Sequence, residues 1–157
     1  LLYNVPSRTS SNIENETIVS LALKHKNIIG VKEASGSISK CMNLISTAPN
    51  DFMIISGDDQ MTYPIMALGG VGVISVQGMA FPRLFSEMVE CALNENFIDA
   101  KKCHYELLKS VDMFYVDGNP SGIKEALCYM GICSSSQVRL PLVKMKKSHA
   151  QTLHTFL

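Results

Sequence analysis

Short apolar runs alternate with helical patterns over the first eighty residues. The runs are four to six residues long, rich in Ile and Val, and apolar on both faces. This is typical of strands in a parallel sheet that is covered on both sides. The pattern predicts four strands, over Leu1 to Asn4, Ile28 to Lys32, Phe52 to Ser56 and Val71 to Val76.

Apolar residues recur at helical spacing between these runs. They predict three helices, over Glu16 to Lys24, Ile38 to Ala48 and Met61 to Leu68. Ser37 is the expected N-cap of the second helix, and Gly69-Gly70 the turn that ends the third. Strands that alternate with helices indicate consecutive βα units and a parallel sheet.

The pattern changes after the fourth strand. Long amphipathic repeats replace the short apolar runs, and they predict helices over Pro82 to Asn94, Phe97 to Tyr115, Ile123 to Met130 and Ser148 to Phe156. We therefore divide the chain into βα units over residues 1–95 and a C-terminal helical region over residues 96–157.

Four βα units are half of the eight that close a TIM (β/α)8 barrel. The predicted fold class is α/β, half of such a barrel followed by a small helical region. An open flavodoxin-like sheet is the alternative, but it favours a Gly-rich loop after the first strand, and the loop Asn4 to Asn12 contains Pro6 and no Gly. The sequence opens inside a strand-like run without Met, which indicates a piece of a longer chain.

Composition excludes several classes of protein. With 14 basic and 14 acidic residues among 157 and 46% hydrophobic residues, the chain lacks the basic excess that binds nucleic acid and is not disordered. No apolar stretch reaches the roughly 20 residues of a membrane span. The scattered cysteines are expected to be reduced, mostly buried thiols of a cytoplasmic protein: Cys41, Cys91, Cys103, Cys128 and Cys133.

No metal site is expected from the sequence. Asp58-Asp59 is better explained as a helix cap than as a pair of metal ligands, because no His lies nearby. His149 and His154 are five residues apart and do not share a helical face, so they are not a ligand pair.

Three side chains near the first two strands could carry chemistry. Lys32 ends a buried strand, where burial favours the neutral, nucleophilic amine; alternatively it reaches solvent or pairs with Glu33. Tyr3 ends the preceding strand and could move protons, or its hydroxyl could bind a backbone group. Arg8 could bind a carboxylate, or it is an ordinary surface arginine. A neutral lysine can form a Schiff base with a 2-oxo acid.

Four segments together resemble the dihydrodipicolinate synthase family in order and spacing, and the resemblance covers essentially the whole chain. The most specific of them is Tyr-Asn-Val-Pro-Ser-Arg-Thr. The segments are Tyr3 to Thr9, Gly30 to Ala34, Ser56 to Asp59 and Gly72 to Val76, and Asn119-Pro120 followed by Lys124 resembles the family's helical tail.

The resemblance implies a role for each candidate. Lys32 would form the covalent imine with pyruvate and Tyr3 would relay protons. Arg8 would bind the carboxylate of aspartate semialdehyde. Ile74 would line the pyruvate pocket with its main chain toward the ligand, and Gly57 would leave room beside it. No metal or organic cofactor is implied.

The resemblance also implies the C-terminal half of the barrel, a lyase of lysine and diaminopimelate biosynthesis, and a homo-oligomer, commonly a homotetramer. The loop that holds the pyruvate carboxylate has no counterpart here, so residues 1–157 alone are expected to be inactive and to self-associate. Two alternatives stay open. One is a sister class I aldolase acting on N-acetylneuraminate or ketodeoxy sugar acids, and the other is a non-catalytic half-barrel partner subunit.

Overall fold

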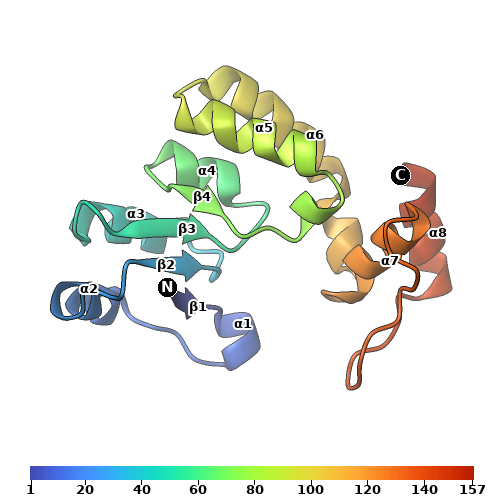
Figure 1. Ribbon diagram of the computed structural model, residues 1–157, viewed down its shortest axis with the longest axis horizontal. Coiled ribbons are helices and arrows are strands. Elements are labelled where there is room, and N and C mark those ends of the chain that lie inside the picture. Colours follow the sequence, from blue (N-terminus) through green and yellow to red (C-terminus); the bar gives the residue numbers. More distant parts are fainter. The chain divides into compact units, whose positions relative to one another are not determined.

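Four parallel strands form one sheet in the order β1-β2-β3-β4, so each strand lies beside its neighbour in the sequence (Figure 1). The computed structural model describes all residues from 1 to 157. The strands are β1 (Leu2–Asn4), β2 (Gly30–Glu33), β3 (Met53–Ser56) and β4 (Gly72–Val73). The helices are α1 (Pro6–Thr9), α2 (Asn15–Lys24), α3 (Ile38–Thr47), α4 (Thr62–Ala67), the 3-10 helix η1 (Gln77–Met79), α5 (Pro82–Leu93), α6 (Phe97–Tyr115), α7 (Ser121–Tyr129) and α8 (Lys147–Phe156).

The register of the sheet sorts its side chains onto two faces. Leu2, Val31 and Ile54 lie side by side on one face, and one residue further along Tyr3, Lys32 and Ile55 lie side by side on the other. Val31 and Ile54 are buried, whereas Tyr3 is exposed and Lys32 and Ile55 are partly exposed. We call these the helix-covered face and the open face of the sheet.

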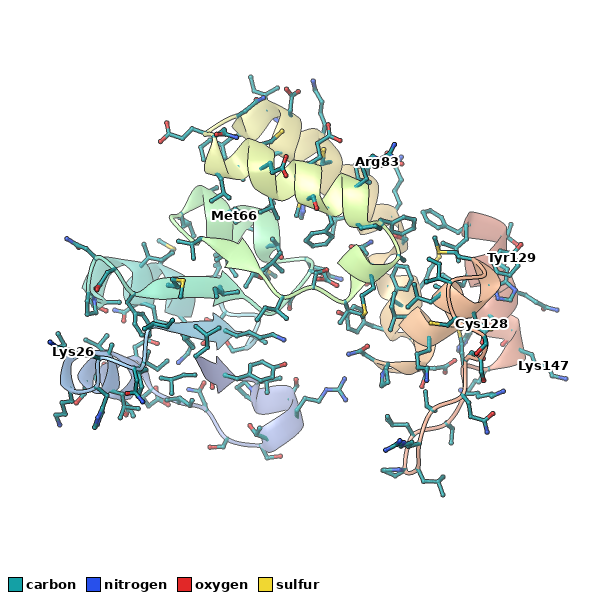
Figure 2. All side chains as sticks on the ribbon, viewed as in Figure 1. Lys26, Met66, Arg83, Cys128, Tyr129 and Lys147 are labelled. Atoms are coloured by element: carbon teal, nitrogen blue, oxygen red, sulfur yellow. The ribbon has the colours of Figure 1, made fainter.

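The helix-covered face owes its burial to α2, α3 and α4. Each helix has an apolar stripe that packs on the strands, and the resulting core contains Ile18, Val31, Cys41, Leu44, Phe52, Ile54 and Ile65. The hydroxyl of Ser37 accepts a hydrogen bond from the Lys40 amide (3.2 Å) and so caps α3, as predicted. Met66 of α4, labelled in Figure 2, is buried with Ala92 and Ala100 in a second, smaller cluster.

The chain forms two compact units. The sheet unit comprises Leu1–Ser75 and Met88–Lys101, and the helical unit comprises Val76–Glu87 and Lys102–Leu157. Helices α5 and α6 contribute residues to both units. The predicted division at residue 95 stays a prediction.

The core of the helical unit forms around Phe114, which packs with Ile123, Ala126 and Leu153. Gly122 permits the close approach of α7 to α6, because a Cβ atom there would lie 2.2 Å from the Phe114 carbonyl oxygen. The buried amide of Gln77 donates hydrogen bonds to the Leu107 carbonyl (2.6 Å) and the Ser110 hydroxyl (2.8 Å).

Helix α8 is held by two carboxylates. Asp117 Oδ2 accepts a hydrogen bond from the Lys146 amide (2.9 Å), just before α8, and pairs with His149 Nδ1 (2.7 Å). Glu125 Oε1 lies 3.1 Å from His154 Nε2, and the His154 ring stacks on Tyr129, labelled in Figure 2. The two histidines therefore have separate partners.

The predicted elements agree with the structure apart from shifts at their ends, the length of the fourth strand and two short helices. The fourth strand is only Gly72–Val73, since the chain leaves the ladder after Ile74 donates to the Ser56 carbonyl (2.9 Å). The predicted loop after β1 contains the short helix α1, and η1 was not predicted. Of the five free cysteines, Cys41 and Cys103 are buried and the other three are partly exposed.

Candidate active site

The candidate residues of the sheet unit lie at the carboxyl ends of its strands. Backbone hydrogen bonds continue the ladder beyond the strands: Ala34 N donates to Asn4 O (2.8 Å) and Gly57 N donates to Glu33 O (2.8 Å). The ends of neighbouring strands are thereby fixed relative to one another. This is the edge of a (β/α)8 sheet at which active sites form.

Lys32 and Tyr3 are direct neighbours across β1 and β2. They are paired in register, and the Lys32 ammonium nitrogen lies 4.3 Å from the centre of the Tyr3 ring. Such a cation–π contact is worth about 0.5–1 kcal/mol at an exposed site. Lys32 Nζ makes no hydrogen bond or ion pair, so the ring is its only polar or charged contact within the chain.

The same geometry tests the alternative contacts predicted for these two residues, Lys32 with Glu33 and Tyr3 with a backbone group. Glu33 does not pair with Lys32, because successive residues of a strand point to opposite faces, and its carboxylate is bound by Asn4 and Ser35. The Tyr3 hydroxyl has no backbone partner, and the side chain is 51% exposed. Both side chains are therefore accessible on the open face.

Gly57 follows β3 and adjoins the Lys32 side chain. A Cβ atom at residue 57 would lie 2.9 Å from Lys32 Cε and 2.7 Å from Ala34 Cβ, distances that real Cβ atoms do not reach. Only glycine therefore allows the Lys32 side chain to lie across the end of β3.

Ile74 and Arg8 complete the predicted set. Ile74 directly follows β4, and its side chain is 47% exposed. Arg8 is exposed in the last turn of α1, the four-residue helix that follows β1. Each of the five predicted residues thus lies on a strand or on the segment directly after it.

Two residues of this region were missed by sequence reasoning. Asn4 and Glu33 directly follow Tyr3 and Lys32, and both are buried on the helix-covered face, where they bind each other. The sequence does contain a signal for these residues, because the last residue of three successive strands is polar. Ser56 of β3 is paired in register with Glu33 and is buried as well. Burial, and next the charge of Glu33, raise the pKa of the nearby Cys41 thiol to about 11, so Cys41 is a neutral core residue.

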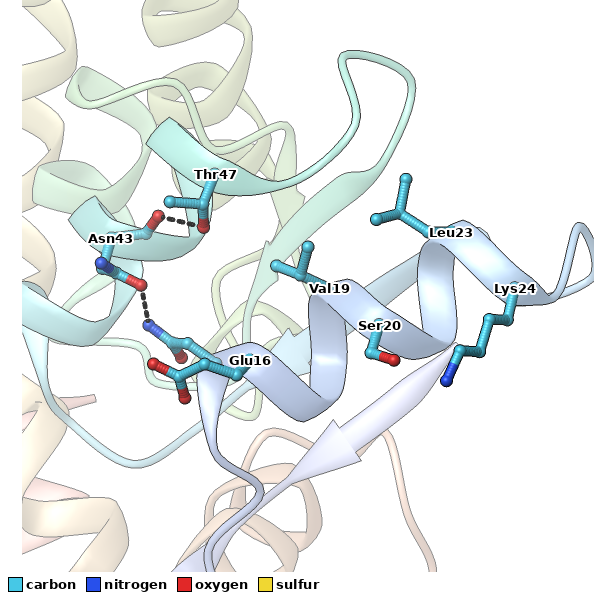
Figure 3. A pocket seen from close by; sticks show the side chains of 8 residues that line it. Glu16, Val19, Ser20, Leu23, Lys24, Asn43 and Thr47 are labelled. Carbon is cyan, nitrogen blue, oxygen red and sulfur yellow. Dashed lines mark hydrogen bonds between the residues drawn. The ribbon is translucent and has the colours of Figure 1, made fainter.

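One groove of the sheet unit lies away from these residues. It has a volume of about 400 Å³ and lies between α2 and α3, lined by Val19, Leu23, Asn43 and Thr47 among others (Figure 3). It contains none of the candidate residues. No group of three or more His, Cys, Asp or Glu side chains is placed to hold a metal ion, and no helix has the length and hydropathy to cross a membrane.

Comparison with known proteins identifies the family. The sequence model of the dihydrodipicolinate synthetase family matches residues 1–157. The chain belongs to this family. It is 47% identical over 156 residues to the 4-hydroxy-tetrahydrodipicolinate synthase of Flavobacterium psychrophilum, covering 99% of this chain and 53% of the relative.

Solved structures of the dihydrodipicolinate synthetase family share the fold. Dihydrodipicolinate synthase from Aquifex aeolicus matches with a TM-score of 0.95 at 34% identity, over 98% of this chain and 52% of that chain. The chloride-inhibited enzyme from Acinetobacter baumannii, complexed with pyruvate, matches with a TM-score of 0.93 at 32% identity over the same shares. The prediction of half a (β/α)8 barrel followed by helices is confirmed, and the chain spans about half the length of the curated relatives it matches.

Proposed function

We propose that this chain supplies the lysine-bearing half of a 4-hydroxy-tetrahydrodipicolinate synthase. This lyase condenses pyruvate with aspartate 4-semialdehyde in lysine and diaminopimelate biosynthesis. The observation that carries the proposal is the Lys32 amine, which has no hydrogen bond or ion pair and lies 4.3 Å from the Tyr3 ring on the open face of a sheet. The pyruvate complex of the Acinetobacter baumannii relative supports pyruvate as the first substrate.

The proposed first stage is imine formation. The neutral amine of Lys32 attacks the ketone carbon of pyruvate, and the resulting carbinolamine loses its hydroxyl as water when a proton reaches that oxygen. Tyr3 is the proton carrier for both steps, because its ring touches Lys32 and its hydroxyl is open to the ligand. Gly57 leaves the space that the Lys32 stem needs.

The second stage forms the carbon–carbon bond. The positive iminium withdraws electrons from the neighbouring methyl carbon, which loses a proton to give an enamine, and that carbon attacks the aldehyde of the second substrate. Arg8 would bind the carboxylate of this substrate as a planar, charged fork. Ile74 would line the pyruvate side of the pocket. No cofactor beyond the covalent imine is proposed, and the homotetramer and the cytoplasmic location stay predictions.

Chemical trapping tests the proposal. The chain is mixed with pyruvate and sodium borohydride, which reduces an imine to a stable amine, and the modified peptide is located by mass mapping. We expect the added mass on the peptide that contains Lys32. Label on Lys24 or Lys40, or no label in any mixture, would overturn the mechanism.

Because the chain spans about half of its relatives, trapping and turnover are measured on two samples. One is the chain alone, and the other is the chain mixed with the part of the Flavobacterium psychrophilum relative that it does not match. Turnover of aspartate semialdehyde is compared with turnover of N-acetylneuraminate. Activity on the sugar acid alone would favour the sister aldolase, and labelled but inactive mixtures would favour a non-catalytic partner.

A further inference from the structure

A buried carboxylate lies directly behind the candidate site. Glu33 is 2% exposed and has no cationic partner. Its oxygens accept hydrogen bonds from Asn4 Nδ2 (3.1 Å to Oε1 and 2.9 Å to Oε2) and from the Ser35 amide (2.7 Å). A buried carboxylate without a cation is costly, and its hydrogen bonds to neutral donors have to offset that cost.

The Asn4 side chain connects three segments of the chain. Besides Glu33 it binds Asn12, whose Oδ1 accepts from Asn4 Nδ2 (3.1 Å), and its own Oδ1 accepts from the Ile13 amide (3.0 Å). One amide, 1% exposed, thus ties β1 to β2 and to the segment that enters α2. The loop between Asn4 and Ile13 is closed by these bonds, and Arg8 lies inside it.

Asn4 and Glu33 are also paired in register, one residue beyond the pair of Tyr3 and Lys32. Side chains alternate along a strand, so the buried pair lies on the helix-covered face and the candidate pair on the open face. A slip of one residue between β1 and β2 would send either candidate residue to the wrong face. The buried pair therefore specifies the register on which the open-face pair depends.

We propose that the hydrogen-bonded pair of Asn4 and Glu33 is a positioning element for the reaction. It holds Tyr3 beside Lys32 and closes the loop that carries Arg8, and neither residue touches substrate. This role rests on the function proposed above. It deepens that function by assigning two residues whose effect passes through Lys32, Tyr3 and Arg8.

Three variants of the same shape test the pair. Asn4→Asp places two carboxylates face to face and breaks the contact. Glu33→Gln, with its oxygen toward the Ser35 amide, loses the hydrogen bond at Oε2 and keeps the one at Oε1, so it weakens the contact. The double variant N4D/E33Q restores one hydrogen bond between the two residues, from the introduced amide to the introduced carboxylate, while the glutamine can still accept from Ser35 and the aspartate from Ile13. Asn12 is exposed, and its amide can donate to that aspartate in exchange for its hydrogen bond to Glu14 Oε1 (2.9 Å).

Asn43→Asp is the matched control for the single variants. Asn43 also binds an asparagine amide, since its Oδ1 accepts from Asn15 Nδ2 (2.7 Å). It differs from Asn4 in being exposed, and it lies in the α2–α3 groove (Figure 3). Asn43 accepts in this contact, so Asn43→Asp keeps the hydrogen bond and controls for the introduced charge away from the candidate site.

Two readouts separate positioning from simple stability. The first is the rate of pyruvate trapping on Lys32. The second is competitive labelling of the amines with trace acetic anhydride against pH, with Lys24 as the internal reference. Labelling needs no catalysis, so it reports on Lys32 whether or not the proposed reaction occurs.

We expect Asn4→Asp to slow trapping on Lys32 about ten- to hundredfold, since small displacements of reacting groups have effects of this size. The double variant should recover most of the lost rate, and Asn43→Asp should match wild type.

The outcomes distinguish the two proposals. Absence of any imine in wild type overturns the proposed function, and the labelling profile of Lys32 then decides the positioning role alone. If the single variants unfold at lower temperature but keep the wild-type Lys32 labelling and trapping, the pair is only structural and the positioning role is wrong. If Asn4→Asp fails to fold, Glu33→Gln and the double variant decide the question. A shifted Lys32 labelling profile in Glu33→Gln, together with recovery in the double variant, supports the positioning role. Wild-type labelling profiles in both variants overturn it.

Discussion

The two units of the molecule differ in the partners of their carboxylates. In the sheet unit, Glu33 is buried among neutral donors, and the nearby Lys32 has no counter-charge. In the helical unit, Asp117 accepts from the Lys146 amide and binds His149, and its side chain is also 3.9 Å from the Lys146 ammonium. The sheet unit thus leaves the Lys32 amine without a hydrogen bond or ion pair, whereas charge in the helical unit holds α8 in place.

This contrast predicts that substitutions in the sheet unit change chemistry and that substitutions in the helical unit change stability. The largest effect is expected for Lys32→Arg, which keeps the positive charge but has no amine that forms an imine. Trapping with pyruvate and borohydride should fall to background, with little change in the unfolding temperature. Lys24→Arg, on the exposed end of α2, is the control and should trap as wild type does. Residual trapping on the Lys32→Arg chain would place the chemistry elsewhere.

Gly57→Ala should give the next largest effect. The new methyl group would lie 2.9 Å from Lys32 Cε, so the side chain has to move, and we expect turnover and trapping to fall about ten- to hundredfold. The comparison variant is Gly70→Ala, whose Cβ would lie 2.6 Å from the Ile65 side chain and not near Lys32. It should lower the unfolding temperature and leave Lys32 labelling unchanged. Equal effects of both variants on Lys32 would show that Gly57 acts only through stability.

Arg8→Ala should affect one substrate only. Loss of a charged, two-pronged contact to a carboxylate costs about 1.5–3 kcal/mol, which raises the KM for aspartate semialdehyde by about one to two decades. Trapping of pyruvate should be unchanged, because Arg8 lies on α1 and not on a strand. Arg83→Ala, at an exposed position of α5, should behave as wild type in steady-state kinetics. An unchanged KM in Arg8→Ala would favour the sugar-acid aldolase.

The smallest effect concerns acid stability of the helical unit. The hydrogen bond from the Lys146 amide, followed by that of His149, holds the pKa of Asp117 below its ordinary value of 3.8. A carboxyl with a lowered folded-state pKa stabilises the fold above its unfolded pKa, and this stability is lost as pH falls through the folded pKa. Amide exchange in α8 should therefore accelerate below about pH 4. Asp117→Asn should flatten this dependence, and Asp51→Asn, exposed in the sheet unit, should not. A wild-type profile in Asp117→Asn would remove Asp117 from the acid response.

Periodicity predicted the βα order well because each strand is a short apolar run followed by a helix with one apolar stripe. It misplaced the end of β2, which extends to Glu33, because a buried glutamate looks like the start of a loop until its partner is known. That partner, Asn4, is 29 residues away in the sequence, so no local sequence pattern indicates the contact. Helix α1 has four residues, too few to show a helical period.

The site was predictable to the extent that its residues lie on strands. Strands that pair in sequence order bring Tyr3 to Lys32, and this pairing followed from the order of βα units alone. The contact between Gly57 and the Lys32 stem depends on side-chain paths that the sequence does not encode locally. The residues themselves suggested chemistry for Lys32, Tyr3 and Arg8, and the family resemblance added Ile74, Gly57 and the substrates. All five roles stay predictions until Lys32 is trapped.

The loop closed by Asn4 has a consequence for redesign. Lys32, Tyr3 and Gly57 are fixed by ladder hydrogen bonds, whereas Arg8 is carried between two anchor points, at Asn4 and at Ile13. A library that varies residues 7–11 and keeps Asn4 and Ile13 would change the side chains that the loop presents. The alignment of Lys32 with Tyr3 would stay as it is. Under the proposed function, bond formation would lie on the strands and acceptor selection on this loop, so new acceptors could be sought by exchanging one short loop.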